Sequence, residues 1–182
     1  MTQELLAPSA EEWLVIIDPQ VIFADPDTSA WGSPMWASAV PEIAALAAAY
    51  GPERTVVTRF VARPDLGGSW APYFRDWPFA LVPDDDPLYD VVAELRSVTG
   101  LVVTEPTFGK WGPRLRAIVG DQPRLTLAGV STDCCVLSTA LPAADAGATI
   151  RIAAAACAGS TPENHQRALE AMALFGPQIV LA

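Results

Sequence analysis

Residues 13–20 read WLVIIDPQ, an apolar run that ends at Asp18-Pro19. A run this short and this continuously apolar is typical of a strand that is buried on both faces of a parallel sheet. Similar runs follow at residues 54–58, 101–104, 125–128 and 149–154, with a shorter one at 179–181. Segments with helical spacing of apolar residues separate most of them. This alternation predicts an α/β fold of three layers, in which helices cover both faces of a central, mainly parallel sheet of about six strands.

The segments between these strands predict five helices, at residues 35–50, 87–98, 111–119, 135–146 and about 160–175. The last begins at a capping signal, Ser160-Thr161-Pro162-Glu163. Residues 59–83 show no clear period and are rich in Gly, Pro, Trp and Phe, and a loop of that length is usually functional. Since no repeat or linker is apparent, we expect residues 1–182 to form one domain.

Composition excludes several classes of function. Eleven basic against twenty-one acidic residues give a net charge of -10, which argues against a nucleic-acid partner. No apolar stretch reaches the roughly 18 residues that a membrane span needs, and the N-terminus has no secretory pattern. The three cysteines, two of them adjacent, make a poor disulfide framework, so the expected location is the cytoplasm.

Three polar or reactive features lie at or just beyond the ends of predicted strands. They are Asp18, the segment around Lys110, and residues 132–135. In open parallel sheets, ligands bind beyond the carboxyl ends of the strands. The fold therefore brings these distant segments toward one site, and the chain's only lysine lies in one of them.

Cys135 follows a strand and starts a predicted helix. In that position the helix dipole favours the thiolate and lowers the pKa of a cysteine, and nearby backbone N–H groups can hold an oxyanion. Cysteine is also among the most often buried residues, so Cys134 and Cys135 equally fit small core residues. Asp18 also fits a purely structural role, because an aspartate before proline often forms a turn.

The segment Gly129-Val130-Ser131-Thr132-Asp133-Cys134-Cys135-Val136 resembles the nucleophile region of the isochorismatase-like cysteine hydrolases. Asp18-Pro19-Gln20 with Phe23 is similar to the D-x-Q-x-x-F signature of that family, and the helix that contains His165 also fits. The resemblance spans almost the whole chain.

The resemblance implies a Cys-Asp-Lys triad that hydrolyses a C–N bond of a small amide, carbamoyl or ureido substrate. Cys135 would attack the carbonyl carbon, Asp18 would move the proton, and Lys110 would hold both groups and favour their charged forms. By analogy a cis peptide would precede Ser131, and the backbone N–H groups of Ser131 and Cys135 would bind the oxyanion. Many members carry the lysine at the end of the third strand, where this chain has Glu105, so Lys110 or a rearranged residue completes the triad.

Nicotinamidases of this family bind a metal through one aspartate and two histidines after the second strand. Here residues 59–70 contain Asp65 but no histidine, and His165, the only histidine, lies far along the chain. We therefore expect no metal and no cofactor. A helix-end or packing role is expected for His165.

The aromatic loop supplies candidates for the walls of a substrate pocket. Those candidates are Phe23, Phe60, Trp70, Phe74, Trp77 and Trp111. Arg59, Arg63 and Arg75 could pair with a substrate carboxylate, although surface arginines more often form weak ion pairs. Relatives often assemble as dimers or tetramers, so a homo-oligomer is expected.

Four other functions compete with the amidohydrolase. The chain could be a catalytically silent member that binds a ligand or acts as a scaffold, or an isochorismatase-type hydrolase, although such enzymes generally lack the cysteine. A redox switch of Cys134 and Cys135 would need a strained ring. A dinucleotide-dependent oxidoreductase is disfavoured because no GxGxxG occurs.

Overall fold

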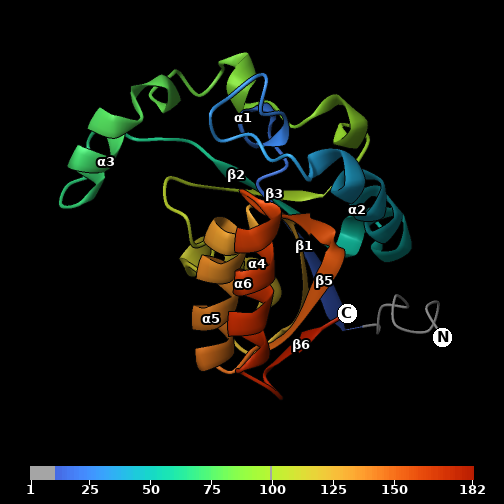
Figure 1. Ribbon diagram of the computed structural model, residues 1–182. Coiled ribbons are helices and arrows are strands. Elements are labelled where there is room, and N and C mark those ends of the chain that lie inside the picture. Colours follow the sequence, from blue (N-terminus) through green and yellow to red (C-terminus); the bar gives the residue numbers. More distant parts are fainter. Residues whose placement is uncertain (1–10, 99) are drawn as a thin grey trace.

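Six strands form one parallel sheet in the order β3-β2-β1-β4-β5-β6. This computed structural model describes residues 11–98 and 100–182 (Figure 1). The strands are β1 (Glu12–Ile17), β2 (Thr55–Phe60), β3 (Leu101–Glu105), β4 (Arg124–Val130), β5 (Thr149–Ala158) and β6 (Ile179–Leu181). The predicted α/β class and the number of strands are confirmed, and every neighbouring pair is parallel.

Helices cover both faces of this sheet. They are α1 (Val21–Ala24), α2 (Trp36–Tyr50), α3 (Trp70–Asp76), α4 (Pro113–Val119), α5 (Leu137–Asp145) and α6 (Pro162–Ala173). On one face α2 packs against β1, β4 and β5, whereas α4, α5 and α6 lie on the other (Figure 1). In the described part of the chain, no helix is both long enough and apolar enough to cross a membrane.

The apolar run of β1 supplies both cores. Leu14 and Ile16 belong to the cluster that contains α2, and Val15 and Ile17 belong to the cluster that contains α4, α5 and α6. All four side chains are fully buried. Because side chains alternate across a strand, a run that must be apolar on both faces becomes continuously apolar.

Two predicted segments differ from the structure. Residues 87–98 do not form one helix but two short 3₁₀ turns, η3 (Pro87–Tyr89) and η4 (Ala93–Leu95). The backbone between them bonds elsewhere: Val91 forms a bridge with Gln20, and the N–H of Val92 donates to Pro19 O. Helical spacing was present, but these tertiary hydrogen bonds replaced the helical ones.

The aromatic stretch 59–83 contains a helix that its sequence did not predict. This helix, α3, has a proline in its first turn, which a helix tolerates there. Its Trp70 and Tyr73 rings pack against Phe108, outside the main helical layers. Its aromatic side chains do recur at the helical spacing i, i+3, i+4 and i+7, at residues 70, 73, 74 and 77, but the glycines and prolines of the surrounding stretch obscured this short helix.

The strand order reverses at β1, which has β2 on one side and β4 on the other. The connection after β1 runs to β2 and the connection after β4 runs to β5 on the opposite side, so a crevice opens beyond the carboxyl ends of β1 and β4. Asp18 follows β1, and Ser131 follows β4. The topology therefore places two of the predicted site segments at one crevice.

Candidate active site

Asp18 occupies a constrained position directly after β1. Its backbone has a φ of 45°, a left-handed conformation that aspartate tolerates better than most residues. Its N–H donates to Thr58 Oγ1 (3.0 Å), and the same hydroxyl donates to Asp18 Oδ1 (2.7 Å). Thr58, in β2, is thus a site residue that the sequence did not single out, although a polar residue within an apolar strand was a signal. These two bonds orient the carboxylate.

Close contact between β1 and β4 shapes the same corner. Gly129 has a φ of 111°, and a Cβ atom there would lie 2.1 Å from Ile17 O. Only glycine fits at this point, and the register of β4 against β5 shifts between Leu127 and Gly129. Ile17 pairs with Gly129 in the regular register of β1 and β4, so the segment that starts at Ser131 emerges beside Asp18.

Lys110 reaches Asp18 from the loop after β3. Its Nζ lies 2.9 Å from Asp18 Oδ2, and both side chains are fully buried. The ammonium also donates to Thr107 O (2.7 Å) and lies 5.5 Å from the centre of the Phe60 ring. The structure therefore brings Lys110, and not Glu105, to the aspartate.

The second carboxylate oxygen of Asp18 is electrostatically paired but not hydrogen-bonded. Among the described residues, Oδ2 accepts no hydrogen bond, although Lys110 Nζ is close. The contact is therefore an ion pair between two fully buried side chains. Burying a charged pair costs desolvation free energy, so this pair is weak evidence for a stabilising role. Oδ1 is held by Thr58, and Oδ2 is the oxygen that faces the ammonium.

Cys135 lies in a π-helical turn, η5 (Thr132–Val136), that leads into α5. Its side chain is buried, and it lines a cavity of about 310 Å³. The pKa of the thiol is raised well above its usual value by a hydrogen bond with Cys134 and by burial. Asp18 raises this pKa further, and Lys110 opposes the increase. The expectation of a low pKa from a helix N-terminus was wrong, because desolvation and a neighbouring thiol outweigh the dipole.

This raised pKa predicts how the thiol reacts. At neutral pH Cys135 is protonated, and the thiolate is the form that iodoacetamide alkylates. We expect its alkylation rate to rise with pH through pH 9 without a plateau, as measured by mass spectrometry of the peptide that contains residue 135. A plateau below pH 8 would show a lowered pKa and contradict this prediction.

Thr139 of α5 ties the lysine loop to the cysteine segment. Its hydroxyl donates to Cys135 O (2.7 Å) and accepts from the N–H of Lys110 (2.9 Å). Gly109 permits this approach, because a Cβ there would lie 2.7 Å from Ser138 O. The loop is consequently held against α5, which sets the position of the ammonium.

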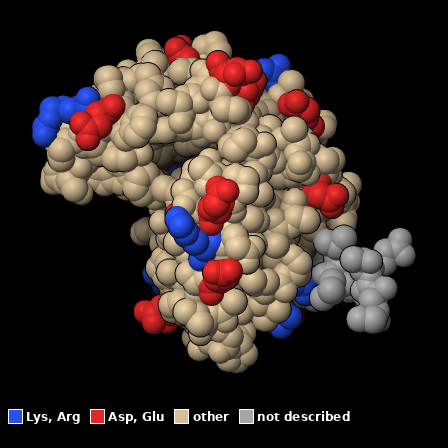
Figure 2. All heavy atoms as spheres, viewed as in Figure 1, with Lys and Arg blue, Asp and Glu red and all other residues tan. Residues whose placement is uncertain are grey.

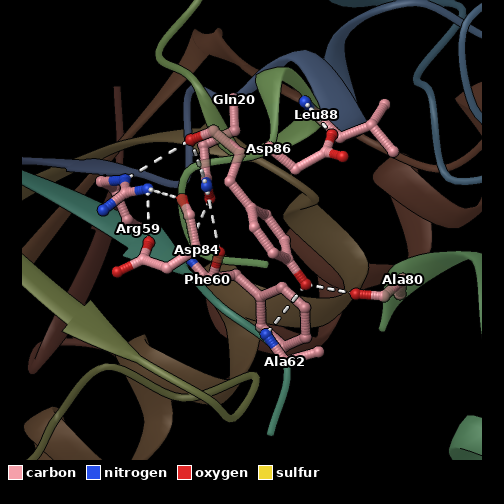
Figure 3. Close-up of polar contacts among 9 residues, drawn as sticks. Gln20, Arg59, Phe60, Ala62, Ala80, Asp84, Asp86 and Leu88 are labelled. Atoms are coloured by element: carbon pink, nitrogen blue, oxygen red, sulfur yellow. Dashed lines mark hydrogen bonds and ion pairs between the residues drawn. The ribbon is translucent and has the colours of Figure 1, made fainter. Parts of the chain in front are cut away.

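Gln20 anchors the other side of the site, as Figure 3 shows. Its Nε2 donates to Phe60 O (3.0 Å) and Tyr89 O (2.9 Å), and its Oε1 accepts from Phe60 N (2.7 Å). The side chain is fully buried. Gln20 therefore holds the end of β2, and with it the Phe60 ring beside Lys110.

Replacing Gln20 by alanine is expected to destabilise the protein by about 2–4 kcal/mol, because Phe60 N, Phe60 O and Tyr89 O each lose a buried hydrogen bond. Urea unfolding monitored by tryptophan fluorescence measures the change. Gln166 of α6 bonds only Glu170 on the exposed surface, and its replacement by alanine should change stability by less than about 0.5 kcal/mol. Equal effects of the two substitutions would contradict the anchoring role.

The cavity is an aromatic chamber beside the cysteine. Its lining comprises Phe23, Ala30, Trp31, Gly32, Phe60, Tyr73, Trp77, Phe108, Ser131, Asp133, Cys134, Cys135 and Ser160. Figure 2 shows the hollow between the segment that carries α3 and the rest of the molecule, with mostly uncharged walls.

Three of the predicted wall residues line this cavity: Phe23, Phe60 and Trp77. Three others do not, and each packs elsewhere: Trp70 on Phe108, Phe74 in the core, and Trp111 beside Arg116. Trp31, Tyr73 and Phe108 were not predicted as wall residues. Their positions depend on how three separate loops meet, which aromatic content alone does not show.

Ser131 and its neighbours form the base of the cavity. The Val130–Ser131 peptide is cis, as the resemblance implied. Both predicted oxyanion residues, Ser131 and Cys135, line the cavity. Behind them, Thr132 Oγ1 and His165 Nδ1 share a hydrogen bond (2.8 Å), and burial lowers the pKa of His165. His165 thus supports the turn from α6.

The donor set after β2 does not fit the metal site of nicotinamidases. Asp65, its only carboxylate, pairs with Arg63 on the surface, and the stretch has no histidine. Within residues 11–98 and 100–182, no three side chains of His, Cys, Asp or Glu cluster as metal ligands. We therefore derive no catalytic step through a metal.

Comparison with solved structures shows the same fold. An isochorismatase family protein from Desulfovibrio vulgaris has 23% identity and a TM-score of 0.77, over 95% of this chain and 94% of that one. An isochorismatase-like hydrolase from Alkaliphilus metalliredigens has 20% identity and a TM-score of 0.77, over 95% of each chain. A pyrazinamidase from Pyrococcus horikoshii, solved in complex with zinc, has 22% identity and a TM-score of 0.73, over 94% of this chain and 98% of that one.

None of the curated proteins matches this chain in sequence. A family model, the isochorismatase domain, matches residues 12–182 and so covers all of the strands and helices described above. The chain therefore belongs to the isochorismatase domain family.

Proposed function

We propose that this protein is a metal-independent cysteine amidohydrolase that cleaves a C–N bond of a small molecule. The observation that carries the proposal is the fully buried Asp18–Lys110 ion pair (2.9 Å) next to a cavity-lining Cys135. A buried ion pair does little for stability, whereas a proton acceptor beside a protonated thiol is what nucleophilic catalysis needs.

In the first half of the reaction, the Cys135 sulfur attacks the carbonyl carbon, and the thiol proton passes to Asp18. The raised pKa of Cys135 makes this transfer necessary, because the resting group is a thiol. The C–N bond then breaks, and the proton moves from Asp18 to the leaving nitrogen. Ammonia or an amine departs, and a thioester with Cys135 remains.

In the second half, water attacks the thioester carbonyl. Asp18 accepts a proton from that water, the C–S bond breaks, and the proton passes from Asp18 to the departing sulfur, which gives a carboxylic acid, the Cys135 thiol and an unprotonated Asp18. Lys110 stays charged throughout and stabilises the carboxylate when Asp18 is unprotonated. In both halves, the backbone N–H groups of Ser131 and Cys135 stabilise the oxyanion of the tetrahedral intermediate.

The choice of a C–N bond is supported by the proton path. An amide nitrogen leaves only after protonation, and Asp18 is positioned to supply that proton. Solved structures with this fold include proteins described as a nicotinamidase from Bacillus subtilis and a pyrazinamidase from Pyrococcus horikoshii. Because Cys134, Cys135 and Cys157 are all free thiols, we further propose a reducing compartment, the cytoplasm.

The test is release of ammonia from a panel of small amides, carbamoyl amino acids and ureido acids by the purified protein. Hydrolysis of at least one amide, unaffected by EDTA, is the expected result. Binding of panel members without any turnover would overturn the proposal and favour a silent, ligand-binding member of the family.

A further inference from the structure

Residues 62–80 supply one wall of the cavity, and we call them the wall segment. The wall segment contains α3, and its Tyr73 and Trp77 line the cavity. Figure 1 shows α3 set apart from the helices that pack on the sheet. Within the described chain, every hydrogen bond of residues 63–79 is made inside residues 63–81. Polar contacts therefore join this segment to the rest of the molecule only at its two ends.

Ring contacts attach the middle of the wall segment. Tyr73 packs on Trp31 and Phe108, and Phe79 packs on Trp31, with ring centres 5.0–5.9 Å apart. Aromatic pairs keep their contact over separations of about 4.5–7 Å, whereas a hydrogen bond fixes the distance between two atoms far more closely. The rings therefore hold the wall segment near the cavity, but its exact position depends on the bonds at its ends.

Both ends of the wall segment bond to one phenol. Tyr89 Oη accepts from Ala62 N (3.0 Å) and donates to Ala80 O, and we call these two bonds the phenol clamp. Figure 3 shows both contacts. The Tyr89 side chain is fully buried, and burial raises the pKa of its phenol, so the hydroxyl remains a donor at neutral pH. A single hydroxyl thus closes the base of the wall segment.

Tyr89 is itself held by residues that adjoin the catalytic groups. Its carbonyl oxygen accepts from Gln20 Nε2 (2.9 Å) and Arg59 Nε (3.4 Å). Its ring lies edge-on to Phe60, at 6.3 Å between centres, and Phe60 lies beside Lys110. Arg59, a candidate partner for a substrate carboxylate, thus bonds the backbone and is not among the residues that line the cavity. The phenol clamp therefore fixes the wall segment relative to the catalytic end of the sheet.

We propose that Tyr89 is a positioning residue for substrate binding, because its hydroxyl fixes the wall segment over the cavity beside Cys135. Tyr89 is not among the residues that line the cavity, so it acts through Ala62 and Ala80. Without the hydroxyl, only a fraction of the molecules holds the wall segment in its binding position, and the apparent affinity falls by that fraction. The effect on substrate rests on the proposed amidohydrolase activity, because it concerns the same cavity.

The experiment replaces Tyr89 by phenylalanine, which keeps the buried ring and removes the hydroxyl. With the best amide of the panel, we expect KM to rise about 3- to 10-fold and kcat to stay within about 2-fold of wild type. Asp18, Lys110 and Cys135 lie outside the wall segment, so the chemical steps are unchanged once substrate is bound. An unchanged KM, or equal losses in kcat and kcat/KM, would refute the positioning role.

Tyr50→Phe is the matched control. Tyr50 is also buried, its hydroxyl donates to Thr126 Oγ1 (2.8 Å), and neither residue lines this cavity. Both variants should lose some stability in urea, because each removes a buried hydrogen bond. Only Tyr89→Phe should raise KM. A similar rise in Tyr50→Phe would show that a general loss of stability weakens binding, and it would overturn the role of the phenol clamp.

Alkylation tests the phenol clamp without any turnover. Iodoacetamide reaches the buried Cys135 through the cavity that the wall segment covers, whereas Cys157 is buried in β5 and does not line that cavity. At pH 9, we expect Tyr89→Phe to raise the alkylation rate of Cys135 at least about 3-fold and to leave that of Cys157 within about 2-fold of wild type. Mass spectrometry of the two peptides measures both rates.

The two thiols distinguish local from global opening. An equal rise at Cys135 and Cys157 would report global opening, and no rise at Cys135 would show that the wall segment has not moved, so either result refutes the phenol clamp. A rise at Cys135 alone supports it even if wild type hydrolyses no amide. In that case the proposed activity fails and the phenol clamp stands.

Discussion

Replacing Cys135 by alanine is expected to lower kcat/KM for amide hydrolysis at least about 10³-fold, because the nucleophile that carries the acyl group is lost. The measurement is ammonia release under single-turnover conditions with the best amide of the panel. Cys135 is buried at a cavity wall, so alanine leaves the fold intact, as circular dichroism and urea unfolding should show.

Cys157→Ala is the matched control, since Cys157 is an equally buried free thiol in β5 whose Sγ faces Leu127 O. It should keep activity within about 3-fold of wild type. Residues that act as a unit are not additive, so Cys135→Ala combined with Asp18→Asn should be no less active than Cys135→Ala alone. A further large loss in the double variant would mean that Asp18 acts independently of the thiol.

Replacing Lys110 by methionine should destabilise the protein by about 3–5 kcal/mol, because Asp18 then stays buried without its counter-ion. The same substitution should abolish amide hydrolysis, with a loss of about 10³-fold or more. Urea unfolding measures the first effect and ammonia release the second. Asp18→Asn, which leaves the ammonium unpaired, should give losses of the same order.

Combining the two substitutions separates folding from chemistry. In Asp18→Asn with Lys110→Met neither charge of this buried pair remains, so most of the lost stability should return, whereas activity should not. The exposed pair of Arg116 and Asp121 is the control, and Arg116→Met should cost less than about 1 kcal/mol. Recovery of activity in the double variant would exclude Asp18 and Lys110 from catalysis.

The alternation of apolar strands and helices was sufficient to predict the α/β class and six strands. It failed at residues 87–98, where helical spacing was real but Val92 bonds Pro19. It also failed for α3, because the helical spacing of Trp70, Tyr73 and Phe74 stands in a short segment of a stretch rich in glycine and proline. Local pattern reports which residues are buried, not which partner buries them.

The candidate site was predictable to a similar extent. Asp18 and Cys135 follow strands, and parallel strands end at a common edge, so their proximity followed from the predicted fold. The position of Lys110 did not follow from the predicted fold. Glu105 occupies the strand end, and the sequence does not show how the five residues from there to Lys110 fold back toward Asp18. Thr58 and Tyr73 were not predicted for the same reason, since each depends on a neighbouring segment.

The pKa of the candidate nucleophile and the pairing of charges at the site are determined only by the tertiary structure. Sequence position predicted a lowered pKa for Cys135, and burial beside Cys134 and Asp18 raises it instead. The residue types, their order and the absence of a histidine pair after β2 were determined by the sequence. Which charges are buried together was decided by packing, because desolvation and pairing depend on distances across the fold.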